Sequence, residues 1–221
     1  MRKIFSPAAV CLALFLFTSC LGASMEIRIR PNGSGRIVLE YRVSRTLETM
    51  ARFDGNERWP AIPVGRADFE RTVARIPGLR LASFSTRNVS GDGGDGGDGD
   101  LVTRAVLDFA HPEALLGFLD ATGSRAAFAP GGSAPMLRLV LLDPFPPIEN
   151  RELLSLFREV SAGYEISVNV RTPRDILRVG LPELSGPART ERGGRNFSLA
   201  VDTGDIPAFT DGLYLDVFWQ P

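Results

Sequence analysis

Few residues of this chain have the side-chain chemistry that catalysis usually requires. His111 is the only histidine and Lys3 the only lysine, so a serine nucleophile would have one candidate general base at most. The sequence contains no G-x-S-x-G motif, and Ser34 lies between two glycines in a predicted turn. His111 precedes Pro112, which is typical of a helix entry. With one histidine and two cysteines, the usual zinc sites are excluded, and we predict a protein that is not an enzyme and holds no cofactor or metal.

An acidic tract is the second place where residue types suggest chemistry. Residues 90–100 read SGDGGDGGDGD and contribute four aspartates, Asp92, Asp95, Asp98 and Asp100. Oxygen ligands on a flexible backbone suit calcium, but the spacing matches neither an EF-hand loop nor the nonapeptide repeat of calcium-binding β-rolls. We predict a solvated, flexible hairpin tip, because glycine maximises backbone entropy and the aspartates repel one another. Calcium binding by this loop stays an open alternative.

The position of Cys20 predicts a covalent modification. It follows a basic start at Arg2 and Lys3, an almost wholly apolar segment 4–17 and two small residues, which is the layout of a secretory signal. The apolar segment is shorter than the roughly 20 residues that cross a bilayer. The other cysteine, Cys11, lies inside this segment and would be removed with it, so the mature chain would have no disulfide.

The tetrapeptide Phe17-Thr18-Ser19-Cys20 resembles the lipobox of bacterial lipoproteins. This resemblance implies that Cys20 is lipidated on its sulfur and becomes the new N-terminus. Residues 1–19 would then be a removed signal peptide, residues 20–25 a lipidated anchor with a short tether, and residues 26–221 a single domain. The alternative is an ordinary signal peptide cut after Ala23, which would leave a soluble secreted protein.

Strict alternation directly after the anchor predicts a β-hairpin. Ile27 and Ile29 would share one face with alternate residues of the segment 37–43, while arginine and glutamate occupy the other face. Asn32 and Gly33 supply residues that tolerate a tight connection.

The rest of the chain predicts an α+β fold built on an antiparallel sheet with about four interspersed helices. Helices are expected from Thr46, around Phe69, from Pro112 and from Asn150. Strands are expected at 79–89, 101–109, 136–142, 164–172, 176–181, 197–201 and 213–219. Of these, 136–142 is predicted to be buried on both faces, and Tyr164 is predicted to point inward with Ile166.

The order of these segments resembles the LppM-type family of bacterial lipoproteins. The pattern consists of a lipobox cysteine, a strand–Asn32-Gly33–strand hairpin, the late strand ISVNVRTPRDIL and then GGRNFSLAVDTGDI before a last aromatic strand. The resemblance implies an α+β domain that binds envelope lipids or glycolipids and has no established catalytic residues. It assigns no binding residue to this chain.

We therefore expect a non-enzymatic lipid- or amphiphile-binding domain, lipid-anchored at Cys20 to the exported side of an inner or outer bacterial membrane. A near-neutral net charge of −1 gives no electrostatic footprint for nucleic acid. One alternative is a module that docks on an envelope protein through Trp59, Phe218 and Trp219, unless these pack in the core. A third is a glycan hydrolase with two carboxylates about 5 to 10 Å apart, a distance that sequence does not reveal.

Overall fold

A computed structural model describes residues 21–44, 65–89, 100–121, 125–129, 134–144, 148, 150–181 and 187–221. They form eleven β-strands, three α-helices and one 3-10 helix, which confirms the α+β class. The helix predicted from Thr46 and the tip 90–99 of the acidic loop lie outside the described residues.

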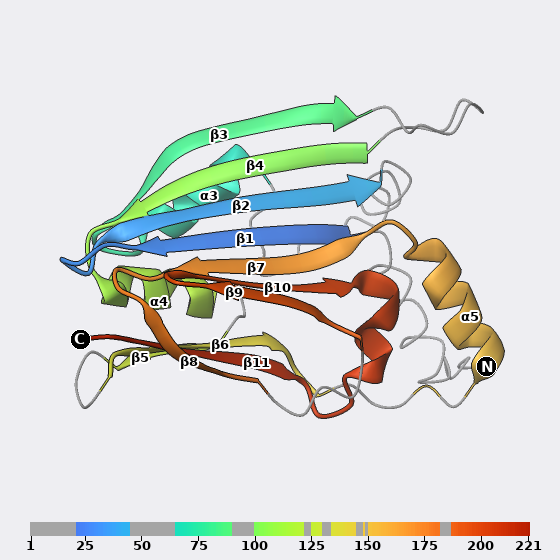
Figure 1. The fold of residues 1–221 in the computed structure, drawn as a ribbon. Coiled ribbons are helices and arrows are strands. Elements are labelled where there is room, and N and C mark those ends of the chain that lie inside the picture. Colours follow the sequence, from blue (N-terminus) through green and yellow to red (C-terminus); the bar gives the residue numbers. More distant parts are fainter. Residues whose placement is uncertain are drawn as a thin grey trace, which may run out of the picture.

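The larger of two sheets has seven strands in the order β3-β4-β2-β1-β7-β10-β9 (Figure 1). Their bounds are β1 Leu21–Ile29, β2 Gly35–Ser44, β3 Leu79–Val89, β4 Asp100–Phe109, β7 Glu165–Arg171, β9 Arg189–Gly193 and β10 Asn196–Asp202. All neighbours are antiparallel except β1 and β7, which run parallel with Ala23 opposite Ile166. The sheet is therefore mixed, and β1 is hydrogen-bonded on both sides.

The hairpin predicted after Cys20 is confirmed as β1 and β2. Ile27 pairs with Ile37, and both side chains are fully buried while Arg28 and Arg36 face solvent. Gly33 has a φ of 79°, a left-handed conformation that costs glycine little. The strand begins earlier than the sequence predicts, because residues 21–25, expected to form a tether, are the first part of β1.

The smaller sheet has four antiparallel strands in the order β5-β6-β11-β8. Their bounds are β5 Ala126–Ala129, β6 Met136–Leu142, β8 Ile176–Gly180 and β11 Leu213–Trp219. The prediction that 136–142 is buried on both faces is wrong. Leu137 and Leu139 are buried, but Arg138 lies on the opposite, outer face and makes a bidentate ion pair with Asp216 at 2.6 Å for both contacts. An arginine in mid-strand keeps that face in contact with water.

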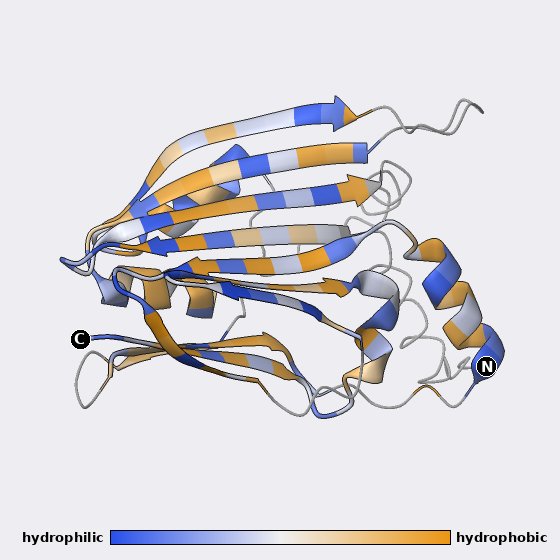
Figure 2. Cartoon of the chain, in the orientation of Figure 1, coloured by the Kyte–Doolittle hydropathy of each residue, from blue (hydrophilic) through white to orange (hydrophobic). Residues whose placement is uncertain are grey.

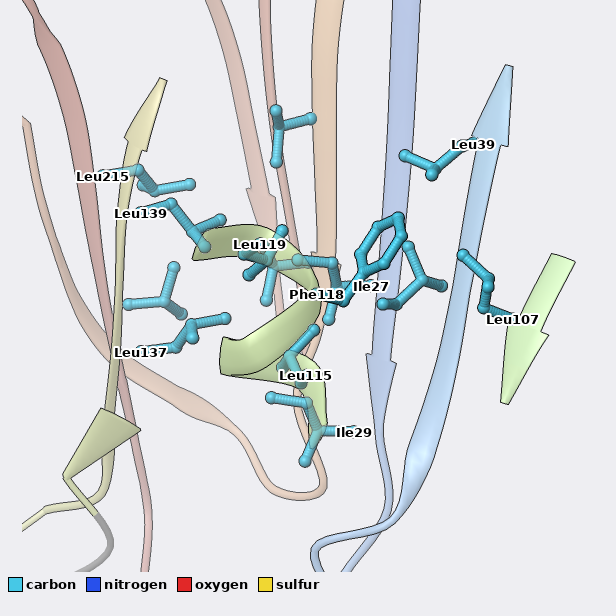
Figure 3. Packing of buried hydrophobic residues seen from close by; sticks show 14 of the residues in the cluster. Ile27, Ile29, Leu39, Leu107, Leu115, Phe118, Leu119, Leu137, Leu139 and Leu215 are labelled. Carbon is cyan, nitrogen blue, oxygen red and sulfur yellow. The ribbon is translucent and has the colours of Figure 1, made fainter. Parts of the chain in front are cut away.

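The core lies between the two sheets and is centred on α4, Pro112–Ala121. Figure 3 shows Leu115, Phe118 and Leu119 of this helix between Ile27 and Ile29 on one side and Leu137 and Leu139 on the other. The three helix residues are no more than 1% exposed. Helix α3, Arg66–Ala74, covers β3 through Phe69, whose ring centroid lies 5.7 Å from that of Phe84.

Helix α5, Arg151–Val160, lies beyond the sheets at the end where β1 begins (Figure 1). Asn150 caps it by accepting hydrogen bonds from the backbone N–H groups of Glu152 and Leu153 at 2.9 and 3.2 Å. The chain then turns directly into β7, the parallel neighbour of β1. The last helical element, η1 at Thr203–Ala208, packs against α5, where Arg158 lies 3.7 Å from Asp205.

Candidate functional site

The predicted lipidation residue, Cys20, lies outside the described residues, but its sequence neighbour Leu21 is the first residue of β1. Gly22 pairs with Arg42 of β2, and Ala23 pairs with both Tyr41 of β2 and Ile166 of β7. An anchor on Cys20 would therefore be attached to the middle of the large sheet, with no free segment between them.

His111 lies where the helix-entry prediction places it, directly before α4. Its Nδ1 atom is 3.3 Å from the backbone nitrogen of Ala114 and 3.0 Å from a carboxylate oxygen of Glu113. The side chain is about half exposed at 46%. These are the contacts of a residue at the start of a helix.

Several described acidic residues on the outer face of the large sheet are paired with arginine. Asp108 accepts hydrogen bonds from Arg36 at 2.7 Å and from Arg80 at 2.8 Å. Glu165 and Asp202, which face each other across β7 and β10, share Arg189. Both carboxylates are therefore engaged in ion pairs with the same guanidinium.

Asp108 supplies a test of these ion pairs. The hydrogen bond from Arg36, helped by Arg80, lowers the pKa of Asp108 below its ordinary value of 3.8. Its ionised form therefore stabilises the fold above that value, and this contribution disappears as the pH falls through the lowered pKa. We expect Asp108→Asn to lower the free energy of unfolding by about 1 kcal/mol at pH 7, and the difference from wild type to be smaller at pH 2.

Urea unfolding at the two pH values measures this effect, with Glu191→Gln on the exposed edge strand β9 as the control. The control should match wild type at both pH values within about 0.5 kcal/mol. A loss at pH 2 as large as at pH 7 would show that Asp108 acts through its shape and not through its charge.

The aromatic residues considered for a docking surface fall in different places. Trp59 lies outside the described residues. Trp219 is 3% exposed and packs in the core with its ring centroid 5.8 Å from that of Phe128. Phe218 is half-buried on the outer face of the small sheet, where the Arg178 guanidinium lies 3.8 Å from its ring centroid. Trp219 therefore packs in the core, which was the alternative to its lying in a docking surface.

The apolar inner face of the large sheet is less covered where β1 begins than at the opposite end. At the opposite end, inward-facing Ile29, Ile37 and Phe109 are at most 6% exposed. At the β1 end, five inward-facing apolar residues are only half-buried. We call them the inner apolar end; they are Ala23, Met25, Val43, Leu101 and Ile166. Ala23 pairs with Ile166 and Val43 with Leu101, and buried Tyr41 lies between these two pairs. Met25 is the middle residue of β1.

A small polar cluster lies at the same end on the outer side of the sheet. Asp100, one of the four aspartates of the acidic tract, forms an ion pair with Arg42 and accepts a hydrogen bond from the Tyr164 hydroxyl at 3.0 Å. The Arg42 guanidinium lies 5.4 Å from the centroid of the Tyr164 ring. Tyr164 thus contacts outward-facing residues, and the expectation that it points inward with Ile166 is wrong. Tyr164 precedes the first residue of β7, so its side chain does not follow the inward–outward alternation of that strand.

Helix α5 adds exposed apolar side chains at the same end of the molecule (Figure 1). Figure 2 shows hydrophobic and hydrophilic residues alternating along this helix. Phe157 is buried at 5% exposure, whereas Leu156 is 46% exposed and Leu153, Leu154 and Val160 are half-buried. The sequence analysis predicted the helix but not this exposure. The signal was available, because apolar residues at 153, 154, 156, 157 and 160 cover a wider arc than one core contact uses.

Two features are absent from the described part of the chain. No helix there is long and apolar enough to span a membrane. No group of three or more histidine, cysteine, aspartate or glutamate residues among the described residues is arranged to hold a metal ion.

Comparison with known proteins gives a distant structural similarity and no sequence match. No protein-family model matches the chain, and no curated protein matches it. The folded domain of LppM from Mycobacterium tuberculosis, solved by NMR, is 12% identical over 91% of each chain, with a TM-score of 0.46. AChBP from Capitella teleta in complex with lobeline is 8% identical over 100% of each chain, with a TM-score of 0.21. Neither similarity assigns a residue or a ligand to this chain.

Proposed function

We propose that this chain is a cell-envelope lipoprotein, acylated on Cys20, whose α+β domain binds a lipid or another amphiphile without catalysing a reaction. The observation that carries the proposal is the position of Leu21, which starts a strand in the middle of the large sheet directly after the lipobox-like cysteine. Acyl chains on Cys20 would hold this end of the domain against the membrane surface. Diacylglyceryl attachment supplies the two chains that stable anchoring generally needs.

The inner apolar end supports the lipid-binding part of the proposal. Its five residues, defined above, are apolar side chains that the fold leaves partly accessible at the end nearest the anchor. Elsewhere the interior is packed by the core cluster, to which α4 and both sheets contribute. A ligand that places acyl or other apolar groups against these residues would cover surface that now contacts water, a gain of about 25 cal/mol per Å². A lipid at a membrane surface has the chemistry that such a site would select.

Substitution of Cys20 tests the anchor. We expect Cys20→Ser to abolish incorporation of radiolabelled palmitate and to leave an uncleaved precursor, because serine has no thiol to acylate. Metabolic labelling followed by gel electrophoresis measures both effects. Cys11→Ser is the matched control and should be labelled like wild type, since that cysteine would be removed with the signal peptide. An unlabelled wild-type chain, or one recovered in aqueous washes without detergent, would defeat the proposal.

Native mass spectrometry of the lipoprotein, extracted in mild detergent, tests ligand binding separately. We expect a bound mass beyond that of the covalent anchor, and a strong loss of it in Met25→Gln, which places a polar group in the inner apolar end. Leu177→Gln, an exposed leucine of β8, should retain the bound mass. A wild-type chain that is always free of non-covalent lipid would remove the lipid-binding part of the proposal and leave the anchor intact.

A further inference from the structure

The strand register determines which end of the domain an acylated Cys20 would hold at the membrane. Consecutive Cα atoms are 3.8 Å apart, and Leu21 is already paired with Val43 of β2. The sheet end that contains Leu21, Val43 and Ile166 therefore could not move far from the anchored residue. Arg28, near the other end of β1, is seven residues further along the strand, which corresponds to roughly 23 Å at 3.3 Å per residue.

Helix α5 lies at the anchored end because of the parallel pairing between β1 and β7. The helix ends at Val160 and β7 begins at Glu165. Ile166 is opposite Ala23, close to the start of β1. Contact with η1 holds the helix in place, since Arg158 lies 3.7 Å from Asp205 and a Cβ on Gly204 would lie 3.3 Å from the Arg158 Cα atom.

The composition of α5 favours an apolar contact over an electrostatic one. Leu156 is one of three large hydrophobic residues that are at least 39% exposed in the described part of the chain, and it belongs to this helix. Arg151 and Arg158 are balanced by Glu152 and Glu159, so the helix has no net charge. Helices that bind through anionic headgroups carry an excess of lysine and arginine on the polar face.

We propose that α5 lies in the membrane interface, with Leu156 and its half-buried neighbours Leu153 and Val160, which are three and four residues away on the same side of the helix, inserted among the lipid headgroups. The contact orients the domain so that the β1 end faces the bilayer and the turn between β9 and β10 faces away. The proposal rests on the anchor at Cys20. Because Cys20 directly precedes β1, acylation there would bring α5 to the membrane surface. The partner of the apolar side of α5 is the bilayer itself, not a single bound lipid.

Leu177 provides a matched control for Leu156. Both are leucines, and both are 46% exposed. Leu177 follows Ile176, whose N–H donates to the Gly194 carbonyl at 2.8 Å in the turn between β9 and β10. It therefore lies at the end of the molecule away from Leu21, where Asn196 pairs with Arg171 and Arg171 with Arg28.

The test uses the mature lipoprotein with Leu156→Cys or Leu177→Cys, each labelled with an environment-sensitive fluorophore. Because the Cys20 sulfur would be acylated and Cys11 removed, the introduced thiol would be the only free one. The protein is reconstituted into phosphatidylcholine vesicles that contain a spin-labelled lipid quencher, and flotation is measured on the same sample. We expect a blue shift and strong quenching at position 156, and neither at position 177.

Each outcome decides the proposal. Flotation with no quenching at either position, or with equal quenching at both, would overturn the oriented contact and leave the lipid anchor standing. Failure to float would instead defeat the anchor and, with it, this inference. Quenching at position 156 that requires added phosphatidylglycerol would also overturn the proposal, because an apolar contact of an uncharged helix does not need anionic lipid.

Discussion

Replacing Gly35 with alanine is expected to lower the free energy of unfolding by about 3 kcal/mol, at the upper end of the range for overpacking a well-packed site. Gly35 is the first residue of β2 and pairs with both Ile29 and Phe109. A Cβ at this position would fall inside the van der Waals radii of the Arg28 carbonyl oxygen and the Phe109 ring. The carbonyl belongs to a paired strand, so relief would require a backbone shift in the hairpin.

The matched control is Gly193→Ala in β9. A Cβ on Gly193 would meet no atom within 4 Å, and its φ is not in the left-handed region. We expect this variant to be unchanged or more stable by about 0.5 kcal/mol, because alanine has a smaller entropy in the unfolded chain. Urea unfolding of the mature chain measures both variants. Equal urea midpoints of unfolding for Gly35→Ala and Gly193→Ala would show that the hairpin accommodates a methyl group at Gly35.

Local patterns in the sequence were sufficient to predict most strands. The alternation of Ile27, Ile29 and the residues after Gly35 requires a half-buried hairpin, and the structure has one. Pro112 and Asn150 predicted the starts of α4 and α5, because a proline in the first turn and an asparagine cap satisfy local backbone requirements. These signals act within a few residues, so they can be read without knowledge of the fold.

Features set by tertiary contacts could not be read in this way. The parallel pairing of Ala23 with Ile166 joins segments far apart in the chain, and no local signal encodes such a partner. Strand β9 has no buried residue, so it lacks the apolar alternation on which strand prediction depends. Arg138 was available as a sign that β6 has a solvent face, since a charged side chain is almost never fully buried without a partner.

The candidate site likewise has one part that local sequence signals predict and another that depends on tertiary contacts. The lipobox-like sequence before Leu21 is a local pattern, so Cys20 could be proposed from the sequence. The inner apolar end is not local, because Val43 meets Leu101 and Ala23 meets Ile166 only after the sheet forms. The exposure of Leu156 likewise depends on how much of α5 the rest of the domain covers.

Replacing Phe118 with alanine is expected to have the other large effect, a loss of about 4 kcal/mol in the free energy of unfolding. Phe118 is 1% exposed and lies on α4 between the two sheets (Figure 3). The variant would leave a cavity lined by residues of both sheets and the helix, which the strands cannot close without breaking their registers. In a domain of this size the melting temperature should fall by about 10 °C.

Phe218→Ala provides the comparison within the same residue type. Phe218 is half-buried on the outer face of the small sheet, against Arg178, so its removal leaves a surface depression that water fills, not a cavity. We expect a loss of about 1 kcal/mol, which includes the contact of the guanidinium with the ring. Thermal unfolding followed by circular dichroism separates the two variants. A Phe118→Ala protein as stable as Phe218→Ala would mean that α4 does not join the sheets, because only a helix packed on both would make the first substitution so much costlier.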